Sequence, residues 1–591
     1  MRTTTGLLKA LATGLLATLA AAKNVTYYWD IGYVNANPDG EMERRVIGVN
    51  GAWPPPEIHV SLHDTLILEV RNSLDMPTTL HSHGLFQNGT NYYDGPYMVT
   101  QCGIPPGANM TYAMPIQQTG TYWIHSHYSA QYVDGIRAPL IIHDPNDPYE
   151  YDEEMVLSMT DWYHEQASTL LARFLSWKNP GGAEPVPNGA LIGNVGGDMQ
   201  KVLQFEPGKT YRIRLINMSA LAMFHFSIEG HAMRVIEVDG FNTEPQEVGN
   251  VMLSAAQRTS ILVTALNSTA NNYVFHADMD TDMFDSIPAA LNYNSTGIIQ
   301  YAEGAPLKRD AAADWSAFND IDLVPYNNTP PAFGFDVSFQ LDVYFNQYTD
   351  AQNHGTFNNI TYVAPRVPSM MIALSTGADA MNATIYGPQT NAHVVQHMQE
   401  VQLVVNNFDA GTHPFHLHGH HFQLIERGPA PYDATYNPRP ATPPVQRDTV
   451  SIPSMEYVIL RFRADNPGAW FFHCHIEWHI EGGLAMVLLE APDVMQRRLV
   501  VPQQILDHCA QANIPTEGNA AGRAGFDLAG APDGPFPYRL GWTRKAKGGM
   551  AGAIVSAIVG FATIFWYGWS SKKTYTPASP PPTQGVAATA E

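Results

Sequence analysis

The chain has 591 residues, more than a single hydrophobic core normally serves, so its length predicts several domains. Apolar residues make up 45% of the sequence and aromatic residues 11%, which excludes wholesale disorder. With 32 basic and 55 acidic residues the net charge is −23, and no basic stripe occurs, which argues against a nucleic-acid partner and favours cations. Three cysteines are too few for a disulfide scaffold.

The first 22 residues have the three parts of a secretory signal peptide. Arg2 and Lys9 supply charge, an apolar run lies around 11–19, and Ala20-Ala21-Ala22 offers small residues for cleavage. Export places the following chain in an oxidising compartment, where Cys102 and Cys509 can pair. Spacing alone does not prove this bond, and two unpaired thiols remain the alternative.

Nine Asn-x-Ser/Thr sequons predict a glycosylated exported part. All precede the last 50 residues of the chain. They begin at Asn24, Asn88, Asn109, Asn217, Asn267, Asn294, Asn327, Asn359 and Asn382.

Short β-branched or alternating runs separated by turn residues predict an all-β protein of sandwiches or barrels. The clearest runs are 65–70, 211–216, 258–264, 401–405 and 457–462. Two segments recur: 120–127 resembles 468–475, and 80–84 resembles 415–419. First and last domains of similar fold are therefore expected, with a middle domain that lacks the recurring histidines. The predicted domains are 23–147, 148–305 and 340–510.

An uncharged apolar stretch at 548–569 is long enough to cross a bilayer as a helix. Basic residues flank it on both sides, so only the signal peptide sets the expected orientation, with the large N-terminal part exported. Residues 511–547 are expected to link the last domain to the membrane. Residues 570–591 form a Pro-rich tail predicted to be cytoplasmic.

Four His-x-His pairs are the candidate metal-binding residues of the sequence. Side chains two apart on a strand share a face, so each pair presents two imidazoles together, as a metal site requires. The pairs are His81/His83, His125/His127, His416/His418 and His473/His475.

A second site is expected on the other face of the last pair. The Cys474 side chain points away from His473 and His475, and with His413 and His479 it forms a His₂Cys set typical of blue copper. Leu484, where a weak axial ligand would stand, cannot bind copper, and Met486 is expected to be a core residue.

In order and spacing these motifs resemble the multicopper oxidases. The resemblance implies three cupredoxin-like β-sandwich domains and four copper ions. It assigns type 1 copper to His413, Cys474 and His479, and type 2 copper to His81 and His416. The type 3 pair falls to His83, His125, His127, His418, His473 and His475. Ser82, where relatives usually carry an aromatic residue, is expected to point away from the ligands. Asp94 and Glu477 match family acids near the cluster, either as proton-relay groups or as hydrogen-bond partners of ligand histidines.

One branch of the family, the fungal plasma-membrane ferroxidases, is similar in its signal peptide, its single C-terminal span and three acids beside the type 1 copper. These acids match Glu184, Asp285 and Asp409, and Tyr362 also fits the branch. The resemblance implies oxidation of Fe²⁺ by O₂ and a partner iron permease in the same membrane. A laccase-like oxidase of phenols or aromatic amines, a non-catalytic copper-binding permease subunit and activity on cuprous ion remain alternatives.

Overall fold

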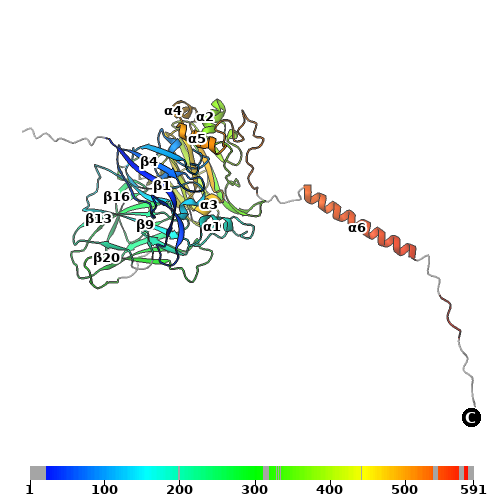
Figure 1. The fold of residues 1–591 in the computed structure, drawn as a ribbon, viewed down its shortest axis with the longest axis horizontal. Helices are drawn as coiled ribbons and strands as arrows, with labels where there is room; N and C mark the ends of the chain where they lie inside the picture. The colour runs from blue at the N-terminus through cyan, green and yellow to red at the C-terminus, as the bar shows by residue number, and fades with distance from the viewer. Residues whose placement is uncertain are drawn as a thin grey trace, which may run out of the picture. The chain divides into compact units, whose positions relative to one another are not determined.

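The computed structural model describes residues 22–196, 200–309, 318–327, 329, 330, 332, 334–440, 442–536, 544–571 and 578–582. The predicted signal peptide, as far as residue 21, and most of the predicted tail lie outside these residues. The chain divides into two units, 1–537 and 538–591. Within its described residues the first unit is built of six β-sheets, two in each of three successive sandwiches. Figure 1 shows this strand-rich unit with its few short helices.

The first sandwich pairs two four-stranded sheets, ordered β2-β1-β4-β6 and β3-β8-β7-β5. It also holds two short 3₁₀ turns, η1 (Asn91–Tyr93) and η2 (Ser129–Asp134). Its strands are β1 (Asn24–Ala36), β2 (Arg44–Val49), β3 (Ile58–Ser61), β4 (Thr65–Asn72), β5 (Leu80–His83), β6 (Asn109–Pro115), β7 (Gly120–Ser126) and β8 (Arg137–His143).

The second sandwich pairs a seven-stranded sheet with a five-stranded one, and carries helix α1 (Ala167–Phe174). The larger sheet is ordered β11-β10-β9-β13-β18-β15-β16. Its strands are β9 (Glu153–Trp162), β10 (Gly189–Ile192), β11 (Val195–Gly196), β13 (Thr210–Asn217), β15 (Met233–Val238), β16 (Phe241–Val248) and β18 (Arg258–Thr264). The smaller comprises β12 (Val202–Gln204), β14 (Met223–Ile228), β17 (Val251–Leu253), β19 (Tyr273–Asp280) and β20 (Asn294–Gln300).

The third sandwich has sheets ordered β22-β21-β24-β29-β26-β27 and β23-β31-β30-β25-β28. The strands of the first are β21 (Val337–Gln347), β22 (Asn353–Phe357), β24 (Glu400–Asn407), β26 (Phe422–Pro429), β27 (Gln446–Arg447) and β29 (Glu456–Arg463). Those of the second are β23 (Ala392–Val395), β25 (His413–Leu417), β28 (Thr449–Ile452), β30 (Gly468–Cys474) and β31 (Ala485–Glu490). The helices and turns are α2 (Ser369–Ser375), α3 (Glu477–Glu481), α4 (Pro492–Arg498), α5 (Gln503–Gln511), η4 (Asp320–Asp322), η5 (Gly377–Met381) and η6 (Ala383–Tyr386).

All five strand predictions are confirmed, because each run falls on a buried strand: β4, β13, β18, β24 and β29. The recurring segments are also structural equivalents. The earlier copies form the adjacent strands β5 and β7, and the later copies form the adjacent strands β25 and β30. Of the sequon asparagines eight are exposed, but Asn217 is buried and its amide donates to the Ala222 and Leu253 carbonyls at 2.9 Å each. A glycan at Asn217 is therefore not supported by the fold.

A disulfide joins Cys102 of the first sandwich to Cys509 on α5, 407 residues later, as predicted. Hydrogen bonds dock α5 beside it: Thr111 N donates to Gln504 Oε1 at 3.0 Å, and His508 Nε2 donates to the Asn109 carbonyl at 2.9 Å. The residues after α5 pack onto the third sandwich, with Ala520 N donating to the Ile385 carbonyl at 3.0 Å. The start of the predicted linker is thus part of the folded unit.

Replacing both disulfide cysteines with serine is expected to destabilise the protein by about 2–5 kcal/mol, because the unfolded chain regains the freedom that this long loop closure removes. The midpoint of thermal unfolding of the copper-free double variant should fall below that of the copper-free wild type. Equal midpoints would contradict this expectation.

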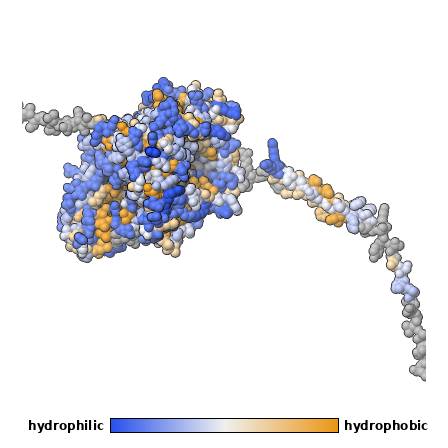
Figure 2. Space-filling model, viewed as in Figure 1, coloured by the Kyte–Doolittle hydropathy of each residue, from blue (hydrophilic) through white to orange (hydrophobic). Residues whose placement is uncertain are grey.

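The second unit contains α6 (Arg544–Ser571), a helix of 28 residues. At 1.5 Å per residue it is about 42 Å long, which exceeds the hydrocarbon thickness of a bilayer. An 18-residue stretch of the helix has a mean hydropathy of 1.9, so α6 is long and apolar enough to cross a membrane, and Figure 2 shows apolar residues along it. The helix extends past the predicted span of 548–569 at both ends.

Candidate metal centre

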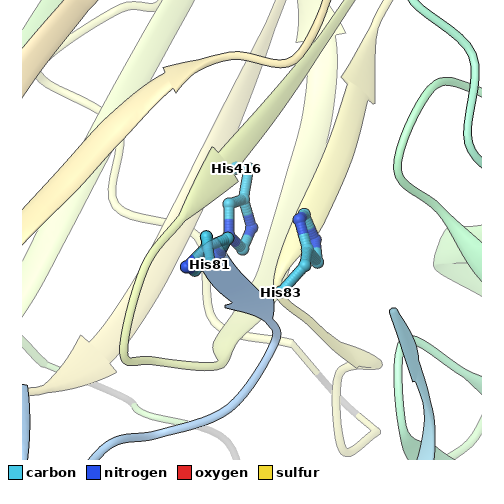
Figure 3. Close-up of side chains that lie close together, drawn as sticks. All are labelled: His81, His83 and His416. Carbon is cyan, nitrogen blue, oxygen red and sulfur yellow. The ribbon is translucent and has the colours of Figure 1, made fainter. Parts of the chain in front are cut away.

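The four His-x-His pairs converge where the first and third sandwiches meet. Strands β5 and β7 place His81 directly opposite His125, and strands β25 and β30 place His416 directly opposite His473. The second histidine of each pair follows two residues later, so it faces the same way. Figure 3 shows His81 and His83 on β5 with their rings beside His416 of β25.

The imidazoles form three triplets in which the ligand nitrogens lie within 4.8 Å of one another. Every triplet contains residues of both domains, so neither domain alone could hold a metal in this way. The triplets are His81, His83 and His416; His83, His125 and His475; and His127, His418 and His473.

Fixed hydrogen bonds on the outer nitrogens leave lone pairs on the inner ones. His81 Nδ1 donates to the Asp94 carbonyl at 2.7 Å, and His416 Nδ1 donates to the Asp448 carbonyl at 2.9 Å. A neutral imidazole has one proton, so each Nε2 is an acceptor. Within the described part of the chain, neither of these buried Nε2 atoms has a hydrogen-bond partner. Such atoms suit a bound cation.

His418 and His473 also have unprotonated Nε2 atoms, and here the two atoms face each other. Their Nε2 atoms lie 3.0 Å apart, while their Nδ1 atoms donate to Asp94 Oδ2 and to the Cys474 carbonyl, each at 2.9 Å. Two lone pairs therefore face each other. Burial and the neighbouring imidazoles hold the pKa of His418 well below its usual value, so protonation does not resolve the conflict. A shared cation would.

The Cys474 side chain points to the opposite face, as predicted. Its Sγ lies 3.8 Å from His413 Nδ1 and 3.5 Å from His479 Nδ1, and these two nitrogens are 3.1 Å apart. All three residues are buried. Leu484 holds this region through its backbone, accepting from Cys474 N at 3.1 Å and donating to the His479 carbonyl at 3.0 Å. Met486 lies opposite Phe472 in the core, as expected.

The three predicted acids converge on one pocket of about 260 Å³ beside this centre. Glu184 Oε1 accepts from His479 Nε2 at 2.8 Å, and Asp409 Oδ2 accepts from His413 Nε2 at 3.1 Å. Asp285 lines the same pocket. Asp282 does too, and our sequence analysis missed it, although its position three residues before Asp285 was an available signal.

A second cavity, of about 200 Å³, opens onto the histidine triplets. It is lined by His127 and His473 together with Glu477 and by Tyr362, which lies here rather than at the pocket of the three acids. Burial and then the charge of Glu481 raise the pKa of Glu477 well above its usual value. Glu481, which the sequence analysis also missed, lines the same cavity.

Asp94 and Ser82 lie as their predictions require. The Asp94 carboxylate is 3.2 Å from His81 Nδ1 in addition to its bond with His418, and the residue is fully buried. The Ser82 hydroxyl donates instead to Met114 Sδ at 3.5 Å, away from the imidazoles. Asp448 was missed: it accepts from His83 Nε2 at 3.2 Å, and no motif around it signals this contact.

Profiles described as Multicopper oxidase match residues 30–147, 153–304 and 362–494. The chain therefore belongs to the multicopper oxidase family, whose cofactor is copper. It is 44% identical to the iron transport multicopper oxidase fetC of Epichloe festucae, over 93% of this chain and 90% of that protein. It is also 44% identical to the iron multicopper oxidase fer1 of Mycosarcoma maydis, over 96% of each chain.

Solved structures show the same relationship. The crystal structure of Fet3p, a multicopper oxidase that functions in iron import, superposes with a TM-score of 0.84 at 37% identity, over 87% of this chain and all of that one. The laccase from Botrytis aclada gives a TM-score of 0.73 at 28% identity, over 83% of this chain and 92% of that chain. Within the family the chain is thus similar to iron transport oxidases.

Proposed function

We propose that this protein is a ferroxidase: it oxidises Fe²⁺ to Fe³⁺ and reduces O₂ to water. The observation that carries the proposal is the pocket of the three acids. Two of its carboxylates, Glu184 and Asp409, accept hydrogen bonds from His479 and His413 of the His₂Cys site. A cation bound by these carboxylates would therefore be separated from that site by a single imidazole. The similarity to iron transport oxidases supports the same function.

Four copper ions fit the donor sets. We assign type 1 copper to His413, Cys474 and His479, and type 2 copper to His81 and His416. Type 3 copper belongs to the two remaining triplets, His83 with His125 and His475, and His127 with His418 and His473. When bound, copper supplies one-electron acceptance at the first site and four-electron reduction of O₂ at the others.

The carboxylates of this pocket would select Fe²⁺ as the electron donor and hold it beside the Cys474 site. Carboxylate oxygens are hard ligands that favour Fe³⁺ over Fe²⁺, which makes iron easier to oxidise. The side chains of Glu184 and Asp409 are 17% and 28% exposed, so solvent and a metal ion reach them. Their bonds to His479 and His413 also fix the orientation of both imidazoles, leaving each Nδ1 free for the metal.

Protons for O₂ reduction would come through Glu477, with Asp94 as a second candidate. Glu477 lines the cavity at the triplets, and burial together with the charge of Glu481 raises its pKa, which favours the protonated form that a proton donor needs. Asp94 instead accepts from His418 and lines neither of the two cavities described above, so its geometry supports orientation of the ligands more than proton transfer.

The remaining organisation follows the same proposal. Helix α6 would anchor the protein in the plasma membrane, with the folded unit outside and the tail in the cytoplasm. Fe³⁺ would pass to an iron permease in that membrane. The proposed organisation also includes domain limits of 23–147, 148–305 and 340–510 and glycans at the exposed sequons.

The test is oxygen uptake by the purified, copper-loaded protein with Fe²⁺, Cu⁺ or a phenol as donor. We expect kcat/KM for Fe²⁺ to exceed that for the phenol, with four Fe²⁺ consumed per O₂. A preference for the phenol would replace this function with that of a laccase, and a blue protein that consumes no O₂ on any donor would leave a copper-binding subunit.

A further inference from the structure

The second domain supplies none of the proposed copper ligands, yet one of its side chains reaches the histidine triplets. Arg258, the first residue of β18, is fully buried. Its Nη1 donates to Asp448 Oδ1 at 2.8 Å and its Nη2 to Asp448 Oδ2 at 2.5 Å. Its Nε donates to the Thr121 carbonyl at 3.0 Å. A single guanidinium therefore contacts all three domains.

One partner of Arg258 contacts proposed copper ligands, and the other lies on a strand that carries one. Asp448 accepts from His83 Nε2 through its carboxylate and from His416 Nδ1 through its carbonyl. Thr121 lies on β7, the strand that carries His125. The guanidinium thus connects the histidine motif of the third domain to both motifs of the first.

Gly84 shows how closely the chain packs around this ion pair. It follows His83 directly, and its φ of +91° suits glycine. A Cβ placed there would lie 2.7 Å from Arg258 Nη2 and 2.7 Å from Asp448 Oδ2. A side chain at this position would therefore collide with the ion pair and with the Tyr122 ring, whose Cδ1 also lies 2.7 Å from that Cβ.

We propose that Arg258 is a positioning residue for the triplets: it fixes the Asp448 carboxylate so that His83 donates from Nε2 and presents Nδ1 to the metal. The structure agrees with this tautomer, because within the described residues His83 Nδ1 is buried without a partner. Without Arg258 the buried carboxylate would lose its counter-charge and both hydrogen bonds that fix its orientation, so it could turn away from His83. His83 would then be free to reorient.

The test compares Arg258→Gln and Arg258→Lys with a matched control, Arg212→Gln. Arg212 is a buried arginine of the same sheet that pairs with Glu237 and Asp147, so its loss destabilises the domain without touching Asp448. The full-length protein in detergent is loaded with copper and challenged with a chelator. Bound copper, the EPR spectrum of the cupric protein and the visible absorption of the Cys474 site are measured.

Changes to residues behind metal ligands usually lower metal affinity 10- to 100-fold. We expect Arg258→Gln to lose copper at about 10- to 100-fold lower chelator concentration, with an altered EPR spectrum and an unchanged absorption from the Cys474 site. Arg258→Lys should recover part of the loss, because it keeps the charge but not both bonds. Arg212→Gln should keep the wild-type spectrum.

A wild-type EPR spectrum and wild-type chelator resistance in Arg258→Gln would overturn the proposal. If that variant does not accumulate, the same result in Arg258→Lys would overturn it. The inference rests on the copper assignment made above, and the two fail differently: a wild-type protein that binds no copper at the triplets refutes the assignment itself.

Discussion

The Glu184→Ala/Asp409→Ala variant is expected to lose about 10²- to 10⁴-fold in kcat/KM for Fe²⁺ while oxidising a phenol nearly as well as wild type. Each carboxylate makes a charge-assisted contact of about 1.5–3 kcal/mol. Together they amount to about 3–6 kcal/mol, and each 1.36 kcal/mol is a factor of ten in rate. The phenol needs neither negative charge. Steady-state oxygen uptake with both donors measures the effect.

Two further variants separate charge from orientation. Glu184→Gln/Asp409→Asn keeps an oxygen that can accept from His479 and His413 but removes both charges, so a loss as large as that of the alanine variant assigns the effect to charge. Asp285→Asn should lower kcat/KM for Fe²⁺ by less than these double variants do. Asp285 lines the pocket, whereas Glu184 and Asp409 also contact the imidazoles of the Cys474 site. Equal losses with Fe²⁺ and phenol would mean that the acids support the Cys474 site in general and that iron is not recognised there.

Glu237→Gln is expected to destabilise the protein by about 3–5 kcal/mol although it lies outside both metal centres. Glu237 is fully buried and pairs with Arg212 at 2.5 Å and Arg214 at 3.2 Å. It also accepts from Thr121 N of the first domain at 2.6 Å. Removing this charge leaves two buried guanidinium groups without their shared partner. The urea midpoint of the copper-free protein should fall.

The pH dependence of stability gives Glu237 a second signature. Burial alone would raise its pKa, but the charges of Arg212 and Arg214 outweigh burial and hold the pKa at about 2. Since the folded value lies below the unfolded one, this group stabilises the protein above about pH 4.5 and loses its effect as pH falls towards 2. Glu237→Gln should flatten the loss of stability in that window.

Glu153→Gln is the control for this experiment. Glu153 is the first residue of β9 in the same sheet, its side chain is 44% exposed and it pairs with Lys209, so its removal should change stability by less than about 1 kcal/mol. If Glu237→Gln also changed stability by less than about 1 kcal/mol, the buried ion pairs of Glu237 would not stabilise the protein as expected.

The sequence predicted those parts of the site whose geometry is local. Residues two apart on a strand share a face, so the His-x-His pairs and the opposite direction of Cys474 followed from spacing alone. Asp409 lies four residues before His413, which is a local signal, but Glu184 and Asp285 were recognised only by resemblance, because no local pattern links them to the site. The triplets likewise combine histidines from motifs hundreds of residues apart.

Asp448 and Arg258 were missed because each acts through a contact that only the assembled domains create. Glu481 is different: it lies four residues after Glu477 on α3, so a local signal was available. Arg258 begins an ordinary strand run, and its side chain matters because of what the first and third domains bring to it. Asn217 shows the opposite error: its sequon is a correct motif, but the fold uses its amide to hold two backbone carbonyls.

The composition of the triplets also determines when, during synthesis of the chain, each metal site can form. Each triplet requires a histidine of the third domain: the first is complete at His416, but the other two need His473 and His475. A ribosome has by then only the last fifth of the chain left to make. Metal loading of the triplets is therefore expected to be a late step, because it requires the third domain to dock against the first.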